Sequence, residues 1–159
     1  MNKPLTFLLS LTFLFLFSSG VFGDEMQDGF DAYKKKDYKE AVMFFHLSAE
    51  QGDALAQLLL GLMYDEGKGA AQDYVEAVKW YRRSAELGNA SAQNNLGFMY
   101  AQGQGVLKDY VIAHMWFNLS FSNGSKNGLE GREMIEEKMS PPQIDKAQEM
   151  ARNWKPTTK

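Results

Sequence analysis

Residues 54–89 read ALAQLLLGLMYDEGKGAAQDYVEAVKWYRRSAELGN, and residues 90–125 read ASAQNNLGFMYAQGQGVLKDYVIAHMWFNLSFSNGS. The two stretches align without a gap. Both begin with Ala-x-Ala-Gln, continue with Leu-Gly-x-Met-Tyr-x-x-Gly-x-Gly, and end with Asp-Tyr-Val-x-Ala-x-x-Trp-x-x-x-Ser. A segment that repeats itself every 36 residues indicates a stacked architecture, in which each copy covers the apolar surface of the next.

Each copy carries the pattern of two helices joined by a turn that contains glycine. In the first copy, Ala56, Leu60 and Met63 recur at three- and four-residue steps, as one face of a helix does. Asp73 followed by Glu76 is the sequence of a capping box, which predicts the start of the second helix. We therefore expect each unit to be a helix–turn–helix that packs on its neighbours.

The repeat pattern divides the whole chain into five segments. Before the two full copies, Asp37-Tyr38 and Ser48-Ala49 stand 36 residues ahead of their equivalents in residues 54–89. After them, Ser140-Pro141 with Gln143 predicts the start of a terminal helix. The expected segments are a signal peptide (1–23), an N-terminal partial repeat (24–53), two repeats (54–89 and 90–125), and C-terminal capping helices with a tail (126–159).

The first 23 residues have the layout of a cleavable signal for export. Lys3 precedes an apolar run over residues 5–17, and Val21 and Gly23 stand at the positions that favour cleavage before Asp24. The alternative is a membrane anchor, but a spanning helix needs about 20 apolar residues. We expect an exported protein, periplasmic or secreted in a bacterial envelope, with no integral membrane segment after cleavage.

Composition excludes several classes of function. The protein has no cysteine, so thiol chemistry, disulfides and cysteine-based zinc sites are excluded. Its formal net charge of −3 does not favour binding to nucleic acid, whose phosphates require a positively charged surface. The only histidines, His46 and His114, stand at different repeat positions and form no metal-binding pair. No cofactor, metal ion or nucleic acid is therefore expected.

The shared framework resembles the Sel1-like repeat, a relative of the tetratricopeptide repeat with a longer turn between its helices. The residues after Ser140 are similar to the terminal helix of bacterial members of that family. The resemblance implies an all-α fold, a right-handed α-solenoid of antiparallel helix pairs. It also implies an adaptor that recognises protein partners. Some cysteine-rich secreted relatives are linked to β-lactams, but this protein lacks their cysteines.

Catalytic interpretations find little support in the sequence. The motifs Gly-x-Ser-x-Gly and Ser-x-x-Lys of acyl-transfer enzymes do not occur. Ser84 and Ser120 are shared repeat positions, which favours a packing role for both. No catalytic residue is predicted, and the protein is not expected to be an enzyme. The alternative is a small envelope hydrolase that acts on peptidoglycan or β-lactams.

Positions that differ between the two copies are the candidates for binding, because the shared positions are explained by folding. On the first helix of each copy, these positions should line the concave surface. The predicted partner-binding residues are Leu55, Leu58, Leu62, Asn94, Asn95, Phe98 and Gln102. The alternative for Leu58, Leu59 and Leu62 is packing against the preceding unit, near Phe30 and Tyr33.

Together these features predict an exported scaffold that binds a protein or peptide through its concave surface. A secreted effector that engages a host protein shares this fold and differs only in destination. The partner's identity is open, and a monomer is favoured.

Overall fold

The computed structural model describes residues 25–157, which form eight helices and no strand. The helices are α2 (Glu25–Lys34), α3 (Tyr38–Glu50), α4 (Ala54–Glu66), α5 (Tyr74–Glu86), α6 (Ala90–Gln102), α7 (Tyr110–Ser122), α8 (Lys126–Glu136) and α9 (Pro141–Asn153). Over these residues, no helix is both long and apolar enough to cross a membrane. The predicted signal peptide lies outside the described residues.

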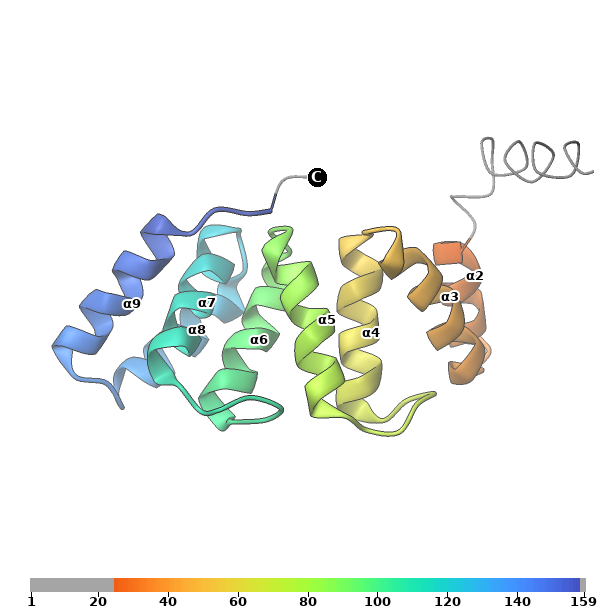
Figure 1. Ribbon diagram of the computed structural model, residues 1–159, viewed down its shortest axis with the longest axis horizontal. Coiled ribbons are helices and arrows are strands. Elements are labelled where there is room, and N and C mark those ends of the chain that lie inside the picture. The colour runs from red at the N-terminus through yellow and green to blue at the C-terminus, as the bar shows by residue number, and fades with distance from the viewer. Residues whose placement is uncertain (1–24, 158–159) are drawn as a thin grey trace, which may run out of the picture.

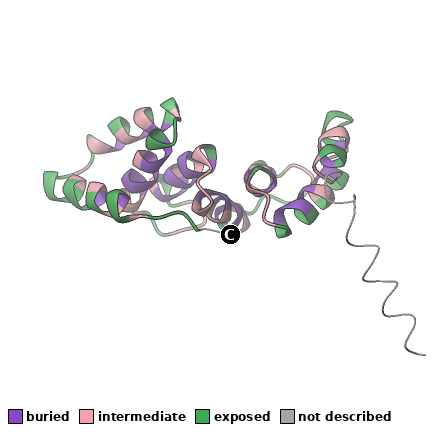
Figure 2. Cartoon of the chain, turned by 90° about the horizontal axis from the view of Figure 1, so that it is seen from above, coloured by how far each residue is buried: buried purple, intermediate pink, exposed green. Residues whose placement is uncertain are grey.

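Helices α2 to α7 follow one another in sequence order along a curved row, and both α8 and α9 pack against α7 at its end (Figure 1). α4 and α5 make one predicted repeat, and α6 and α7 make the next. Buried residues gather between the helices, and exposed residues lie along the outer sides of the row (Figure 2). The predicted fold class, an all-α solenoid of helix pairs, is confirmed.

The helices begin where their capping residues predict. The side chains of Asp53 and Asn89 accept hydrogen bonds from backbone N–H groups in the first turns of α4 and α6, at 2.8 and 2.9 Å. Asp73 and Asp109 do the same for α5 and α7. Since each cap satisfies donors that the helix leaves unpaired, the caps fix the boundaries of every repeat.

Within each pair, an aromatic ring of the second helix packs on a glycine of the first. A methyl group at Gly61 would lie 2.4 Å from the Tyr81 ring, and one at Gly97 would lie 2.6 Å from the Phe117 ring. Larger residues therefore cannot occupy these glycine positions without displacing the ring. Gly29 of α2 makes the same contact with Phe45 of α3, which identifies α2 as the first helix of the N-terminal unit.

The N-terminal unit differs from the others in its turn. Asp37 stands eight positions after Gly29, whereas Asp73 stands twelve positions after Gly61. In the shorter turn, Lys36 adopts the left-handed conformation with a φ of 64°. The turns of the later repeats use glycine for this conformation, which glycine adopts without steric cost.

Buried polar side chains lock successive helices together. Gln57 and Gln93 each donate from Nε2 to the backbone oxygen of an alanine in the preceding helix, at 3.0 and 3.1 Å. Ser84 and Ser120 donate to the first residue of their own unit's first helix, at 2.6 and 2.7 Å. These bonds repeat every 36 residues, so the shared glutamines and serines have structural roles.

The C-terminal end of the row is closed by α9 and the residues after it. The Trp154 ring packs edge-to-face against Trp116 of α7, with ring centroids 5.9 Å apart. Beyond it, the N–H of Thr157 donates to the backbone oxygen of Glu86 at the end of α5 (Figure 1). The tail therefore connects the last helix pair to the preceding repeats, as expected of a terminal cap.

Candidate functional site

A groove runs between α6 and α8, the first helices of the third and fourth units. It has a narrow part of about 160 Å³ and a wider part of about 300 Å³, which meet at Phe98 and Met134. The narrow part is lined by Phe98, Ala101, Gln102, Tyr110, Met134, Ile135 and Lys138. The wider part is lined by Asn94, Phe98, Asn127, Glu130, Gly131 and Met134. We call this the α6–α8 groove.

The position of α8 follows from two glycines that face α7. A methyl group at Gly128 would lie 2.7 Å from the backbone oxygen of Phe117, and one at Gly131 would lie 2.6 Å from the Phe117 ring. The two helix backbones therefore approach more closely than larger residues would allow. The close contact with α7 fixes α8 as the far wall of the groove.

A buried polar network holds α8 in this place. His114 of α7 is fully buried, and its Nε2 lies 2.7 Å from Oε1 of Glu136 on α8. Arg132 donates from Nη1 to Oδ1 of Asn118 at 3.0 Å, and its Nε lies 3.6 Å from the same glutamate oxygen. Since these side chains pair α7 with α8, they support the wall of the groove without facing its interior.

The polar wall of the wider part contains an amide without a partner for its oxygen. Asn94 is only 7% exposed, and its Oδ1 is buried with no hydrogen-bond partner. This oxygen is one of six such buried side-chain atoms among the described residues, so the difference between the two repeats is what distinguishes this position. In the preceding repeat, Leu58 occupies this position. The fold itself therefore does not require an amide here.

The floor of the groove is apolar and firmly packed. Phe98 stands edge-to-face on Phe117, with ring centroids 4.9 Å apart and an angle of 75° between the rings. Ile135 is buried beneath it, whereas Met134 remains 43% exposed at the rim. An apolar floor with a few polar groups at its sides is the usual composition of a ligand site.

The structure brings together three of the seven predicted binding residues, namely Asn94, Phe98 and Gln102, which lie along one side of α6. The other four do not line the groove. Leu55 is exposed at the start of α4. Leu62 is half-buried against the larger core cluster.

Two of the predicted binding residues, Leu58 and Asn95, have contacts within the fold instead of facing a partner. We expected Leu58 to face outward, but it is buried because it packs into the larger core cluster, which also contains Val78 of α5 and Leu96 of α6. Asn95 interacts with the Tyr81 hydroxyl, which donates to Oδ2 of Asp65 at 3.0 Å. Burial, together with the negative charge of Asp65, raises the pKa of Tyr81. Leu59 packs against the N-terminal cluster that includes Phe30, which is the alternative considered above.

The groove also contains residues of α8 that the comparison of the two repeats did not indicate. Glu130, Met134 and Lys138 stand 36 residues after Asn94, Phe98 and Gln102. Continuing the period beyond residue 125 would have identified them, although the framework residues of that segment have diverged. The pairing of His114 with Glu136 could not be predicted by comparing the repeats. His114 stands at a position that varies between the copies, and Glu136 lies in the divergent segment.

The residues considered for catalysis have other roles in the structure. Ser84 and Ser120 are fully buried and bonded to backbone oxygens. His46 packs edge-to-face on Trp80, and His114 is closed off from solvent. Among the described residues, no three His, Asp or Glu side chains gather as a metal site would require.

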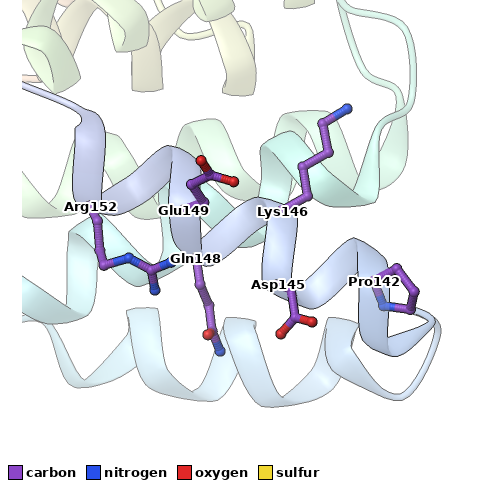
Figure 3. A pocket seen from close by; sticks show the side chains of 6 residues that line it. All are labelled: Pro142, Asp145, Lys146, Gln148, Glu149 and Arg152. Carbon is purple, nitrogen blue, oxygen red and sulfur yellow. The ribbon is translucent and has the colours of Figure 1, made fainter.

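A second depression lies on the outer side of α9 (Figure 3). Its lining residues are Pro142, Asp145, Lys146, Gln148, Glu149 and Arg152. All of them come from one helix, and they mix both signs of charge without an apolar floor. Such a polar face suits the exposed end of a helical stack, which needs to be solvated.

Comparisons with known proteins agree with this architecture. The family model for the Sel1 repeat matches residues 20–53, 54–89 and 90–125. A protective antigen of uropathogenic Escherichia coli, described as displaying an SLR fold, is similar over 83% of this chain, with 32% identity and a TM-score of 0.78. A Sel1 repeat protein from Oxalobacter formigenes is similar over 79% of this chain, with 27% identity and a TM-score of 0.66.

The match to these two structures covers only part of them, 29% of the antigen and 54% of the Oxalobacter protein. The cysteine-rich protein B of Helicobacter pylori shares the fold over 70% of this chain and 97% of its own, with 19% identity and a TM-score of 0.56. No curated protein matches the sequence.

Proposed function

Because the chain belongs to the Sel1 repeat family, whose repeats generally mediate protein interactions, we propose that it is a scaffold that binds a protein or peptide partner in the α6–α8 groove. The observation that carries this proposal is the apolar floor of the groove beside the side chain of Asn94. A position that folds with leucine in one repeat and carries an incompletely bonded amide in the next favours a role in binding.

The groove has the size and composition for a segment of a partner. Its two parts meet at Phe98, so an extended peptide fits along α6 better than a compact small molecule does. The exposed Met134 supplies a flexible apolar contact at the rim, as methionines do in adaptable binding surfaces. Binding by a groove between helices is a recurring mode of peptide recognition.

The test compares partner capture by two substituted proteins. Met134→Glu places a charge on the rim of the groove, whereas Met43→Glu makes the same change at an exposed methionine of α3, outside the groove. Each protein is immobilised, and partners from cells that produce it are quantified by mass spectrometry. We expect Met134→Glu alone to lose the partners of the wild-type protein. Equal losses for both variants, or for neither, would contradict the proposal.

We further propose that the protein is exported and acts in the bacterial envelope or outside the cell. The support is the arrangement of residues 1–23, with a charged start, an apolar run and small residues before Asp24. N-terminal sequencing of the protein recovered from the periplasm or medium should begin at Asp24. A product that stays in the cytoplasm and keeps Met1 would refute this part.

A further inference from the structure

We propose that the segment bound in the α6–α8 groove is an extended peptide with one large apolar side chain and an acidic side chain two positions away from it. The apolar side chain enters the narrow part between Phe98 and Met134, and the carboxylate lies beside Lys138 and Lys108. This inference rests on the proposed function, and it adds the chemistry of the partner.

The narrow part of the groove fits a single apolar side chain. Its volume is about 160 Å³, and a cavity of roughly 150 Å³ with apolar walls holds a molecule the size of benzene. Phe98, Ala101 and Ile135 form its apolar surface, and Met134 closes it from the side. A leucine, methionine or phenylalanine side chain therefore fills the space without rearrangement of the helices.

One end of the narrow part is cationic. Lys138 lines it directly, and Lys108 lies next to it, with its Nζ 4.9 Å from the centre of the Tyr110 ring. Neither lysine forms an ion pair with a carboxylate of the described residues. Two ammonium groups that no carboxylate of the described residues neutralises, at the end of an apolar pocket, favour a ligand that brings its own carboxylate.

The pKa of the Tyr110 hydroxyl is affected by the same two lysines. A hydrogen bond with Lys108 lowers the pKa of the Tyr110 hydroxyl; burial opposes this effect, and the charges of Lys108 and Lys138 add to it. Both lysines therefore act on the same point at the mouth of the pocket. The side chain of a bound acidic residue would meet both positive charges there.

The opposite end of the groove is negatively charged, so the two ends favour different parts of the ligand. Glu130 lines the wider part together with Asn94 and Asn127. A carboxylate there would meet a like charge, so the acidic side chain belongs at the lysine end. Asn94 and Asn127 line the wider part with amide side chains, which suit the polar backbone groups of an extended peptide.

The spacing of the two anchors follows from the geometry of an extended peptide. Lys138 and the apolar surface of Phe98 line the same small pocket, so the apolar side chain enters it and the acidic side chain reaches Lys138 from the same side of the peptide. In an extended peptide, side chains that point to the same side are two residues apart. The expected motif therefore has one residue between the apolar residue and Asp or Glu, with either of the two first in sequence and the acid at the lysine end.

The experiment begins with random linear peptides displayed on phage and selected on the full protein. The enriched sequence is synthesised with a C-terminal amide, so that the only carboxylates are those of side chains. Binding is measured by fluorescence anisotropy. Replacement of the apolar residue by serine should weaken binding by about tenfold or more. Replacement of the acidic residue by lysine should weaken it by roughly threefold or more.

A charge exchange tests the assignment of Lys138. Lys138→Glu should weaken the acidic peptide and strengthen the peptide in which lysine replaces the acid. Lys146→Glu makes the same change on the outer side of α9 and should alter neither affinity. This reversal requires direct proximity of the two charges, which a general loss of stability would not produce.

The remaining outcomes separate the two proposals. Selected peptides that carry basic or neutral residues in place of the acid, yet lose binding with Met134→Glu, would overturn the chemistry proposed here and leave the groove as the binding surface. If no peptide is selected, or if selected peptides bind Met134→Glu and Lys138→Glu as tightly as wild type, both the chemistry and the proposed function fail.

Discussion

The repeats formed by residues 54–89 and 90–125 have the same framework and different surroundings. Tyr81 packs on Gly61 as Phe117 packs on Gly97, so the helix pairs are built in the same way. The difference is at positions that the framework leaves free. Leu58 fills the core of the first copy, whereas Asn94 brings an unpaired amide to a groove in the second. What the copies share explains the fold, and what they do not share forms part of the groove that we propose as the binding surface.

The largest expected loss of stability is at the buried tryptophans, which both repeats share. Trp80 and Trp116 are 1% and 4% exposed. Trp80→Ala and Trp116→Ala should each lower the free energy of unfolding by about 3–5 kcal/mol, because each leaves a large cavity in a core. Urea denaturation followed by circular dichroism measures this loss. A small loss at either site would mean that the two positions are not equivalent.

Two single substitutions, each placing at one position the residue found at the other, test the difference between positions 58 and 94. Leu58→Asn should lower the free energy of unfolding by about 2–4 kcal/mol, because it removes buried apolar surface and introduces a buried amide. Asn94→Leu should raise it by about 1 kcal/mol, because an unpaired oxygen leaves the interior.

Asn94→Leu should also weaken partner binding, so stability and binding would change in opposite directions at this one residue. Thermal unfolding and anisotropy on the same samples check both. A destabilised Asn94→Leu protein would show that the amide belongs to the framework.

A smaller effect is expected at the serines that close each helix pair. Ser84 and Ser120 donate to backbone oxygens at 2.6 and 2.7 Å. Ser84→Ala and Ser120→Ala should each cost about 1 kcal/mol of unfolding free energy, the net value of a typical hydrogen bond. Because the geometry is the same in both repeats, the two losses should agree within the error of chemical denaturation. A large difference between them would argue against equivalent packing.

The smallest expected effect concerns an ion pair that only the earlier units share. Arg83 stacks on Trp80 and bonds Glu50 at 3.1 Å, and this hydrogen bond lowers the pKa of Glu50 below 4.5. Glu50→Gln should cost less than about 1 kcal/mol, because the pair is exposed to solvent.

The pH dependence of this cost follows from the lowered pKa. A carboxylate with a depressed pKa stabilises the fold above its unfolded-state pKa, and this stabilisation is lost as the pH falls through the folded-state value. The difference between wild type and Glu50→Gln should therefore be present at pH 7 and vanish well below pH 4.5. Melting curves across this range would contradict the assignment if the difference persisted in acid.

Much of the fold could be predicted from the sequence, because its determinants are local and repeated. Caps such as Asp53 and Asp73 mark helix starts by residue type alone. The site was harder to predict. Helical spacing identified Asn94, Phe98 and Gln102, but it also suggested Leu58, which is buried because it packs into the larger core cluster.

The other wall of the groove belongs to a segment whose framework has diverged. Its position depends on the close approach of Gly128 to α7 and on the pairing of His114 with Glu136, 22 residues away. These are tertiary contacts that no periodic pattern reports. The 36-residue period therefore indicates which residues of α8 correspond to those of α6, but not the close packing of α8 on α7 that forms the groove.

The most direct test of the central claim, that the α6–α8 groove is the surface that binds the partner, is photo-crosslinking in the cells that produce the protein. A photoreactive phenylalanine analogue replaces Met134 at the rim of the groove or, as the matched control, Met43 on α3, which is 51% exposed. We predict one strong covalent adduct from position 134, none from position 43, and loss of the adduct when Asn94→Leu is added. Adducts from position 43 alone, or of equal yield from both positions, would contradict the claim.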